Sequence, residues 1–469
     1  AAISASLMAC VAEPLLTGLG GAGLAMIRVG EEVTCCDLFT NAPGLGRPPE
    51  RSSDPMTTVM LDFGPTSQRF HVGASSVAPP GIPAGLWAMH AQHARLPMTV
   101  LAAPAVRAAR EGYCVPIGFE RVGELLWAIQ ELSAESARLF GPSGERPWRA
   151  GDHFQCPTLG DTIERYATAG PRWLQDGDMA RQLLQAVGDG GAITADDLAA
   201  YSPVMRPALH STYRGADIWV PGPPSVGGIL VLHALQILEH AGGMPDALTA
   251  EEVRRIGGAM QQVEATRDED FYGWLVEDGN AEAFVDALRN PGRQPGHTTH
   301  ISVVDENQNM VSITTSLGET AGLCIPGTGL SLNNFLGEED VNPPHAPRPP
   351  GQRLYTMCSP TLLRSGNHHY ALGSGGSSRI RSAILHGAVY LLDHGLNPEQ
   401  AVRAPRAHVE FGHLHVEVDG RPPGCMDDLA RESSLPVRSF EGANMFFGGL
   451  HIAGAVDGSF VGAGDPRRS

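Results

Sequence analysis

The sequence contains no lysine, so arginine carries its entire positive charge. It has 33 basic residues against 51 aspartates and glutamates, which gives a formal net charge of −18 at pH 7. A chain this acidic is a poor candidate for binding nucleic acid or an anionic membrane surface, because both are negatively charged themselves. Hydrophobic residues make up 42% of the chain, which predicts a folded globular protein.

Other patterns are also missing. No apolar run reaches about 18 residues, so no transmembrane helix is predicted. The eight cysteines form no C-x-x-C pair, and we expect buried free thiols rather than a zinc site or a disulfide framework. The pairs His368-His369 and His413-x-His415 have no neighbouring carboxylate or cysteine that could complete a metal site. We therefore expect solvated or core histidines there. We therefore expect no metal and no cofactor.

Near its start the chain carries GLGGAG at residues 18–23, which matches the pattern G-x-G-x-x-G. A dinucleotide-binding fingerprint needs a strand before these glycines and a helix after them. Here the order is reversed: the apolar stretch Ala1–Val11 predicts the tail of a buried helix that begins before the given sequence, and GLAMIRVG predicts a strand. The glycines therefore predict a tight turn with close backbone packing.

The sequence leaves the cellular compartment undecided: periplasmic, secreted and cytoplasmic locations are all open.

Helical spacing dominates the first part of the chain and short strands dominate the last. Apolar residues recur at helical intervals within residues 80–150, 157–200, 229–241 and 251–289. Two strands are expected within residues 205–221, and from Thr298 onward short strands alternate with glycine turns and one apolar helix. The proline-rich stretch 337–353 predicts a surface loop. Together these patterns predict a layered α/β arrangement rather than repeated βαβ units.

The junction between the loop and the strand at Thr298 is the feature that points to chemistry. The flexible stretch NPGRQPGH gives way to TTHISVVD, and a second hydroxyl cluster, SITTS at residues 312–316, follows on a strand expected to pair with the first. Glycine runs and the motif GSGGSS lie further on. Acyl transfer needs a nucleophilic hydroxyl, a base and an oxyanion hole of backbone N–H donors. Yet the chain has no G-x-S-x-G elbow, and spacing places no His–Asp pair.

A threonine can supply its own base if its α-amino group is free. An α-amine has a pKa of about 7.7–8.0, close to the pH at which most enzymes work. Such an amine exists at Thr298 only if the chain is cut just before it. The flexible arm that precedes it is a plausible place for such a cut.

On these residues the chain resembles the γ-glutamyltranspeptidase family of N-terminal-nucleophile hydrolases over essentially its whole length. The segments that carry the resemblance are VAEPLLTGLGGAG (11–23), APG (42–44), GIPAGLWAMHAQHARLP (81–97), GGAITADDLAAY (190–201), YRG and PGPPSVGG (213–228), TTHISVVDENQNMVSITT (298–315), GTGLSLNN (327–334), SPTLL (359–363), GSGGSSRI (373–380), APRAHVE (404–410) and GDPRR (464–468).

The resemblance implies an α+β fold, the four-layer αββα sandwich in which two stacked antiparallel sheets are covered by helices. It implies one domain built from two regions, a helix-rich large-subunit region, 1–297, whose start is missing, and a strand-rich small-subunit region, 298–469. These would be the two pieces of a self-cleaved proenzyme, associated as a heterodimer. The implied partner is a small γ-glutamyl or related amide.

The family's pattern also implies roles for residues at the junction. Thr298 matches the threonine that becomes the nucleophile and the new amino terminus, so the cut would fall between His297 and Thr298. Ser316 stands where the family usually has a second threonine that holds and polarises the nucleophile, and serine keeps that hydroxyl.

Further matches concern the oxyanion hole and the substrate. The motif GSGG matches the glycines whose N–H groups form the oxyanion hole, here Gly375 and Gly376, although an ungapped alignment shifts the pair to Gly376 and Ser377. Arg47 lies near the family's arginine for the substrate α-carboxylate, with local spacing that differs by about one residue. Thr356 matches one of two hydroxyls on the same carboxylate.

The chain departs from the family where the substrate's amino acid head would bind. Met357 replaces the second hydroxyl, and the family's asparagine falls at Leu317 or Gly318, neither of which can hold an α-amino group. The downstream glutamine and aspartate fall at Phe335 and Glu338. The nucleophile and oxyanion machinery therefore look intact, whereas the γ-glutamyl pocket looks rebuilt.

Glu319, Glu338 and Glu339 are acidic substitutes that could receive an ammonium group, or else residues of a solvated loop. Three functions remain open: a γ-glutamyl hydrolase or transferase, an acylase on another amide such as a glutaryl side chain, and a processing-incompetent protein with a non-catalytic role.

Overall fold

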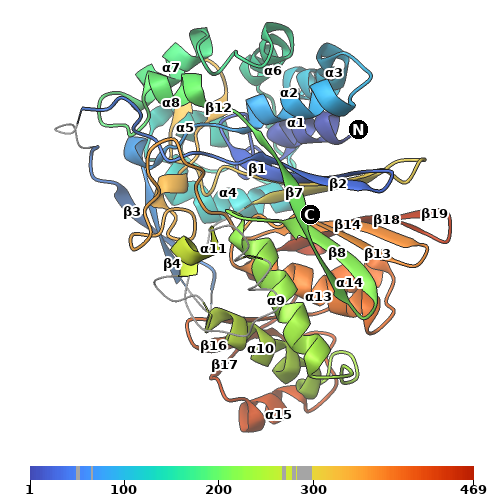
Figure 1. Ribbon diagram of the computed structural model, residues 1–469. Coiled ribbons are helices and arrows are strands. Elements are labelled where there is room, and N and C mark those ends of the chain that lie inside the picture. Colours follow the sequence, from blue (N-terminus) through green and yellow to red (C-terminus); the bar gives the residue numbers. More distant parts are fainter. Residues whose placement is uncertain (49–52, 65–66, 267–270, 277–280, 282–297, 469) are drawn as a thin grey trace.

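A computed structural model describes residues 1–48, 53–64, 67–266, 271–276, 281 and 298–468. Its centre is an antiparallel sheet of ten strands, and β7 joins the two halves of this sheet (Figure 1). In spatial order the strands are β19 (Ser459–Ala463), β18 (Gly449–Val456), β14 (His368–Gly375), β13 (Thr361–Ser365), β8 (Ala216–Pro221), β7 (Val204–Tyr213), β2 (Glu32–Leu38), β1 (Ala22–Val29), β10 (Met310–Ser316) and β9 (Thr299–Val304).

The sheet folds back on itself, so its two ends lie face to face. β9 packs against β14 and β18, and β10 packs against β14, although these strands stand far apart in the strand order. A buried apolar cluster that includes Leu24, Met26 and Leu362 fills the space between the halves. All residues of β1 except the last are buried, as expected for a strand covered on both faces.

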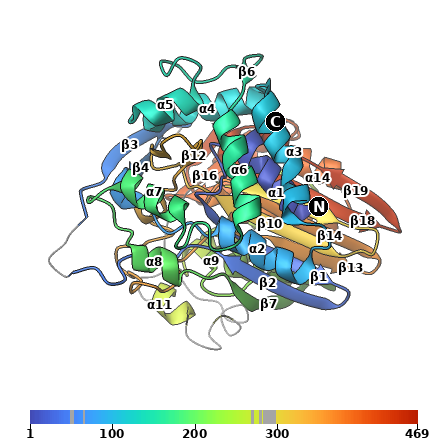
Figure 2. The same ribbon diagram turned by 90° about the horizontal axis from the view of Figure 1, so that it is seen from above.

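Helices cover both outer faces (Figures 1 and 2). On the outside of the half with β1 and β2 lie α1 (Ala2–Ala12), α2 (Ile82–His93), α3 (Met98–Glu111) and α6 (Pro157–Ala169). On the outside of the other half lie α9 (Val226–His240), α10 (Ala250–Glu264), α13 (Arg379–Leu392) and α14 (Pro398–Arg403). This arrangement confirms the predicted αββα sandwich, with the refinement that its two sheets are joined into one.

Smaller elements surround the sandwich. The helices are α4 (Ile117–Gln130), α5 (Ala134–Phe140), α7 (Asp178–Val187), α8 (Ala195–Ala200), α11 (Phe271–Leu275) and α15 (Cys425–Glu432), together with the short 3₁₀ turn η2 (Phe335–Gly337). The strands form the hairpins β3 (Thr57–Asp62) with β4 (Ser67–Val72), β5 (Tyr113–Cys114) with β6 (His153–Phe154) and β11 (Cys324–Ile325) with β12 (Leu330–Ser331), and the sheet β15 (Ala407–Glu410), β16 (His413–Glu417) and β17 (Val437–Phe440).

Several local predictions are confirmed. The apolar start forms α1, GLGGAG is a turn that leads into β1, and residues 205–221 hold the hairpin β7–β8. The proline-rich stretch 337–353 is only partly a surface loop, because Asp340 and Val341 are buried. The polypeptide turns inward there, since Val341 joins the apolar cluster between the two halves. The part of the predicted helical stretch 251–289 beyond α10 and α11 lies largely outside the described residues.

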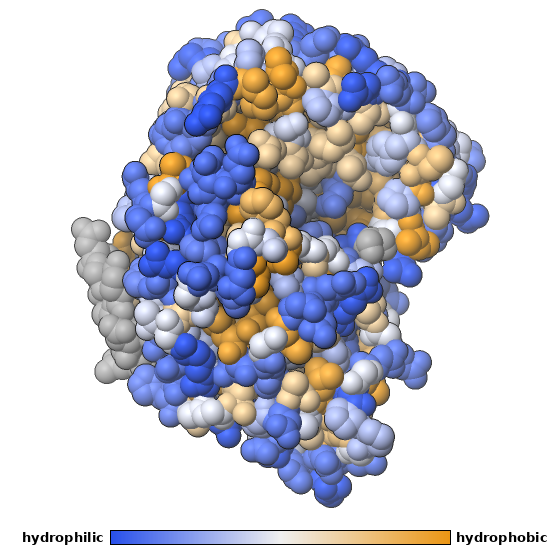
Figure 3. All heavy atoms as spheres, turned by 90° about the vertical axis from the view of Figure 1, so that its right-hand side faces the viewer, coloured by the Kyte–Doolittle hydropathy of each residue, from blue (hydrophilic) through white to orange (hydrophobic). Residues whose placement is uncertain are grey.

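Within the described ranges, no helix is long and apolar enough to cross a membrane. Figure 3 shows the face toward which the strand hairpins point: hydrophobic side chains gather around a hollow there, and hydrophilic side chains cover most of the remaining surface.

Candidate active site

Thr298 lies at the end of the fold where the two halves of the sheet meet. It directly precedes β9, and its residue surface is 5% exposed. Its carbonyl oxygen packs against Gly375 at the end of β14, so closely that a Cβ on Gly375 would collide with it. Only glycine fits at this position, and its lack of a side chain lets the end of β14 approach Thr298 this closely.

Ser316 faces Thr298 across the β9–β10 ladder. Thr299 pairs with Thr315 in antiparallel register, which makes Thr298 and Ser316 the next opposed positions. The hydroxyl oxygen of Ser316 accepts a hydrogen bond of 2.8 Å from the backbone N–H of Gly318, which has a positive φ of 67°. Gly21, in the turn before β1, lets the backbone approach the carbonyl oxygen of Ser316, because a Cβ there would collide with that oxygen. The glycine turn at residues 18–23 thus supports the strand that ends in Ser316.

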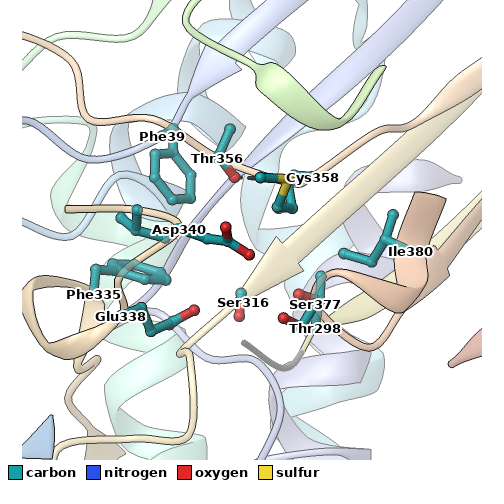
Figure 4. A pocket seen from close by; sticks show the side chains of 12 residues that line it. Phe39, Thr298, Ser316, Phe335, Glu338, Asp340, Thr356, Cys358, Ser377 and Ile380 are labelled. Atoms are coloured by element: carbon teal, nitrogen blue, oxygen red, sulfur yellow. Dashed lines mark hydrogen bonds between the residues drawn. The ribbon is translucent and has the colours of Figure 1, made fainter. Parts of the chain in front are cut away.

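The turn from β14 into α13 forms one side of the same cleft. Gly376 has a φ of 118° and Ser377 a φ of 63°, and α13 begins at Arg379. Backbone N–H groups at a helix start carry partial positive charge, which suits a developing oxyanion. Ser377 lines the cleft, and Figure 4 shows its side chain beside Thr298 and near Ser316.

An arginine whose guanidinium nitrogens are buried stands behind this turn. A Cβ placed on Gly376 would lie 3.2 Å from Nη2 of Arg468. Burial lowers the pKa of Arg468 to about 10, against the opposing effect of Glu13 and Asp465, so the guanidinium is still charged at neutral pH. It therefore adds positive potential behind the backbone groups of the turn.

Three acidic side chains, which we call the acidic wall, lie together on the opposite side: Glu338 and Asp340 line the cleft, and Glu319 acts on the charge of Glu338. All are buried, with exposures of 0%, 6% and 1%. Burial, followed by the charges of Glu319 and Asp340, raises the pKa of Glu338 well above its usual value. Figure 4 shows Glu338 and Asp340 turned toward the space above Ser316. A cleft built in this way offers hydroxyl groups on one side and carboxyl groups on the other.

The comparisons with known proteins now decide the family. The gamma-glutamyltranspeptidase family model matches residues 1–469. The chain belongs to the gamma-glutamyltranspeptidase family. It is 30% identical over 501 residues to the acylase ACY 1 proenzyme of Pseudomonas sp. (strain V22), covering 99% of this chain and 87% of that protein. It is 27% identical over 515 residues to the glutathione hydrolase proenzyme of Escherichia coli (strain K12), covering 100% of this chain and 86% of that protein.

A solved structure supports the fold independently. The crystal structure of the cephalosporin acylase from Bacillus halodurans superposes with a TM-score of 0.79 at 22% identity, covering 99% of this chain and 89% of that chain. Relatives in the gamma-glutamyltranspeptidase family thus carry the names of both glutathione hydrolases and acylases. Membership of the family therefore does not by itself specify the substrate.

The structure brings most of the predicted site residues of this gamma-glutamyltranspeptidase family member together. Thr298, Ser316, Glu338 and Thr356 line one cleft, Gly375 abuts Thr298, and Glu319 acts on the charge of Glu338. His297 lies outside the described residues. Their catalytic and binding roles stay predictions.

Arg47 is placed differently from the other predicted residues. It is not among the residues that line the cleft, and its Nη1 donates a hydrogen bond of 3.3 Å to the carbonyl oxygen of Ala192. The loop that carries it is tied to the start of α8, because Asp197 accepts hydrogen bonds of 2.8 and 2.9 Å from the backbone N–H groups of Gly44 and Leu45.

Sequence reasoning missed several residues of the cleft. These include Phe39, Cys358 and Ile380. Phe39 forms an aromatic wall with Phe335, a position already expected at the substrate pocket, with ring centroids 5.0 Å apart. Glu339 was proposed as an acidic substitute, but it is exposed, and its neighbour Asp340 points into the cleft instead. In the sequence, the acidic run GEED indicated that acidic residues lie near the pocket, but it does not reveal which of their side chains turns inward.

Proposed function

We propose that this protein is a self-cleaved amide hydrolase and acyltransferase of the γ-glutamyl type, with Thr298 as its nucleophile. The observation that supports this most directly is the position of Thr298. It sits at the start of a central strand, opposite Ser316, beside a glycine turn and in a cleft that ends in an acidic wall. No cofactor is needed for this chemistry.

Self-cleavage is the first proposed step. The hydroxyl of Thr298 attacks the carbonyl carbon of His297, and the peptide bond is exchanged for an ester that water then hydrolyses. The products are a carboxylate on His297 and a free α-amine on Thr298. The pieces 1–297 and 298–469 stay together as a heterodimer, because β10 of the second piece pairs with β1 of the first over seven residue pairs.

Turnover then uses the new α-amine as the base. It takes the proton of the Thr298 hydroxyl as the oxygen attacks the substrate amide, and backbone N–H groups of the Gly375–Ser377 turn stabilise the oxyanion. Collapse of the intermediate returns the proton to the departing amine and leaves a threonyl ester. Water, or an acceptor amine, attacks this ester, releases the acyl group and restores the hydroxyl. Ser316 donates a hydrogen bond that holds the nucleophile.

The acidic wall favours a γ-glutamyl over a glutaryl acyl group. A γ-glutamyl group carries an ammonium that buried carboxylates can receive, whereas the single carboxylate of a glutaryl group would meet like charge in a site of low dielectric. The glutaryl acylase is the second candidate, and the acylase name of the relative that is 30% identical supports it.

A denaturing gel and amino-terminal sequencing test the cleavage. We expect two bands, with the smaller one beginning Thr-Thr-His-Ile; a single band near 49.6 kDa in folded protein would leave only a non-catalytic role. The cleaved protein is then assayed with γ-glutamyl and glutaryl p-nitroanilides, and Thr298→Ala protein serves as the blank. Faster release from the γ-glutamyl anilide supports the first candidate, and faster release from the glutaryl anilide supports the second.

A further inference from the structure

Arg468 carries a buried charge that no group of the described chain receives through a hydrogen bond. It lies in the short 3₁₀ turn η4 (Pro466–Arg468). Among the described residues, its three guanidinium nitrogens, Nε, Nη1 and Nη2, are buried and have no hydrogen-bond partner. Buried polar groups in folded proteins are nearly always paired, and burying a charge without such bonds lowers stability. The fold therefore holds this guanidinium where it is costly.

The two acids that act on Arg468 from a longer distance are each bonded elsewhere. Glu13 and Asp465 are the acids whose charges oppose the effect of burial on the pKa of Arg468. Oε2 of Glu13 accepts a hydrogen bond of 2.6 Å from the hydroxyl of the residue that follows the proposed nucleophile. Asp465 forms ion pairs through both of its oxygens, at 2.6 Å with Arg406 and at 3.1 Å with Arg467. Arg468 therefore adds a further positive charge beside acids that already bind other groups.

Two glycines bring this charge against the turn from β14 into α13. A Cβ on Gly449 would collide with the side chain of Arg468, and a Cβ on Gly376 would lie 3.2 Å from its Nη2. Gly449 pairs with Gly375 at the end of the β14–β18 ladder, and Figure 4 shows Ser377, the next residue of the turn, beside Thr298. The absence of side chains at these positions thus places the guanidinium directly behind the turn that faces Thr298.

We propose that Arg468 is a positioning residue whose charge strengthens the oxyanion hole of the Thr298 reaction at the expense of the stability of the fold. This inference rests on the proposed function, because the oxyanion belongs to that reaction. Arg468 is not among the residues that line the cleft. It acts through the backbone N–H groups of the Gly375–Ser377 turn, whose partial positive charge its own charge reinforces. Trade-offs of this kind between activity and stability occur where a catalytic site needs an arrangement that the fold alone does not favour.

Arg468→Met tests the effect on the reaction, because it removes the charge and keeps an unbranched side chain. Nitroaniline release by the cleaved protein is measured with the anilide that the parent turns over fastest. We expect kcat to fall about ten- to a hundredfold while KM stays within about twofold of the parent value. Formation and hydrolysis of the acyl-enzyme both pass through an oxyanion at the same turn, whereas the bound substrate carries no such charge. Arg468→Lys keeps a positive charge and should restore most of the rate.

The stability of the protein should not fall with the rate. Arg468→Met should melt at or above the temperature of the parent, because it removes a buried charge without hydrogen bonds. Arg467→Met is the matched contrast at the next position, since Arg467 pairs with Glu417 and Asp465; its melting temperature should fall by at least about 3 °C. Arg95→Met is the control, because Arg95 is exposed in the loop between α2 and α3, and it should change neither the rate nor the melting temperature.

Several results would overturn the inference and leave the proposed function intact. One is an unchanged kcat in Arg468→Met, and another is a rise in KM alone. A fall in its melting temperature as large as that of Arg467→Met would make Arg468 a structural residue, and an equal loss of rate in Arg95→Met would remove the special role of its position.

Two further outcomes are decided by other proteins. If Arg468→Met stays uncut, Arg468→Lys gives the answer: cleavage and turnover near those of the parent support a need for charge, and loss of both overturns it. A parent protein that neither cleaves itself nor turns over any anilide overturns the proposed function, and the inference with it.

Discussion

Two groups of buried charge lie close to the cleft at Thr298, and they differ in composition. One, which we call the paired ionic cluster, joins three arginines to three acids in ion pairs: Arg379–Glu410 (3.4 Å), Arg406–Asp465 (2.6 Å) and Arg467–Glu417 (2.5 Å). The other is the acidic wall, in which Glu319, Glu338 and Asp340 lie close enough together for their charges to act on one another.

The pKa values of the two groups show what this difference means. Burial works to raise the pKa of Glu410, but the charge of Arg379, the nearby His408 ring and the hydrogen bond from Ser378 outweigh it and hold that pKa far below its usual range. Burial and two neighbouring carboxylates raise the pKa of Glu338. In the paired ionic cluster each acid has an arginine beside it, so removing one partner would leave a buried charge uncompensated, whereas the carboxyl groups around Glu338 raise one another's cost of ionisation.

The largest effect we predict separates activity from stability. Thr298→Ala should abolish chain cleavage and lower turnover about a million-fold or to below detection, because both reactions use the same hydroxyl. The unfolding temperature should stay close to that of the uncleaved parent chain, since the substitution leaves both groups of buried charge in place. Gel analysis, anilide turnover and calorimetry check the three parts, and residual acyl-enzyme formation in this variant would assign the nucleophile elsewhere.

In the paired ionic cluster we predict a loss of stability from a substitution that does not touch the nucleophile. Asp465→Asn should lower the free energy of unfolding by about 3–5 kcal/mol, because Arg406 and Arg467 would be left buried without their counter-charge. Asp465 also accepts a hydrogen bond of 2.7 Å from the N–H of Leu450 in β18. Calorimetry measures the loss. Asp457→Asn is the control, since Asp457 is 74% exposed in its pair with His368, and a similar loss there would show that the cluster has no special role.

Ser316→Ala tests whether the Ser316 hydroxyl assists Thr298 in cleavage and turnover. We predict that cleavage and turnover slow by roughly one to three orders of magnitude, the usual cost of one lost transition-state hydrogen bond. Ser316→Thr should restore most of both rates, because it returns a hydroxyl to the same position. Single-turnover kinetics measure the effect, and an acyl label found on Ser316 would reverse the roles of the two residues.

The smallest predicted effect has the opposite sign from the Asp465 variant. Glu338 has a raised pKa, so the unfolded chain gives up this proton more readily and stability falls as the pH rises from about 4.5 toward the raised pKa. Glu338→Gln has no such proton and should gain about 1–2 kcal/mol over the parent above that window. Melting curves at a series of pH values measure the gain. Glu339→Gln should show none, and a loss of stability in Glu338→Gln would mean that its charge is already balanced.

Much of the fold could be predicted because its signals are local. The change of pattern at Thr298, the apolar start of the chain and the hairpin at 205–221 each depend on neighbouring residues. The choice between Glu339 and Asp340 depends instead on how the turn η2 directs the chain that follows it, which no periodicity encodes. Arg47 shows the same limit, because Asp197, about 150 positions further along the sequence, anchors its loop.

The cleft wall is also a product of distant packing. Phe39 directly follows β2, and it reaches Phe335 only because the apolar cluster between the two halves of the sheet joins both residues. The pairing of β7 with both β2 and β8, which joins the two halves of the sheet, depends on the same long-range packing. A family resemblance could supply the layers and the nucleophile, but it could not supply the side chains by which this member differs.

The order of strands has a consequence for how the protein refolds. The region before Thr298 contributes β8, β7, β2 and β1 to the middle of the sheet, while the region that begins there contributes β10 and β9 at one edge and β13, β14, β18 and β19 at the other. In the proposed cleaved form, the strands of the second piece therefore flank those of the first on both sides. An uncut chain can regain this arrangement as a first-order process, but two separated pieces must first find each other. The proposed cut would thus make refolding depend on protein concentration. The lifetime of the cleaved protein would then be set by its rate of unfolding, because the separated pieces refold poorly.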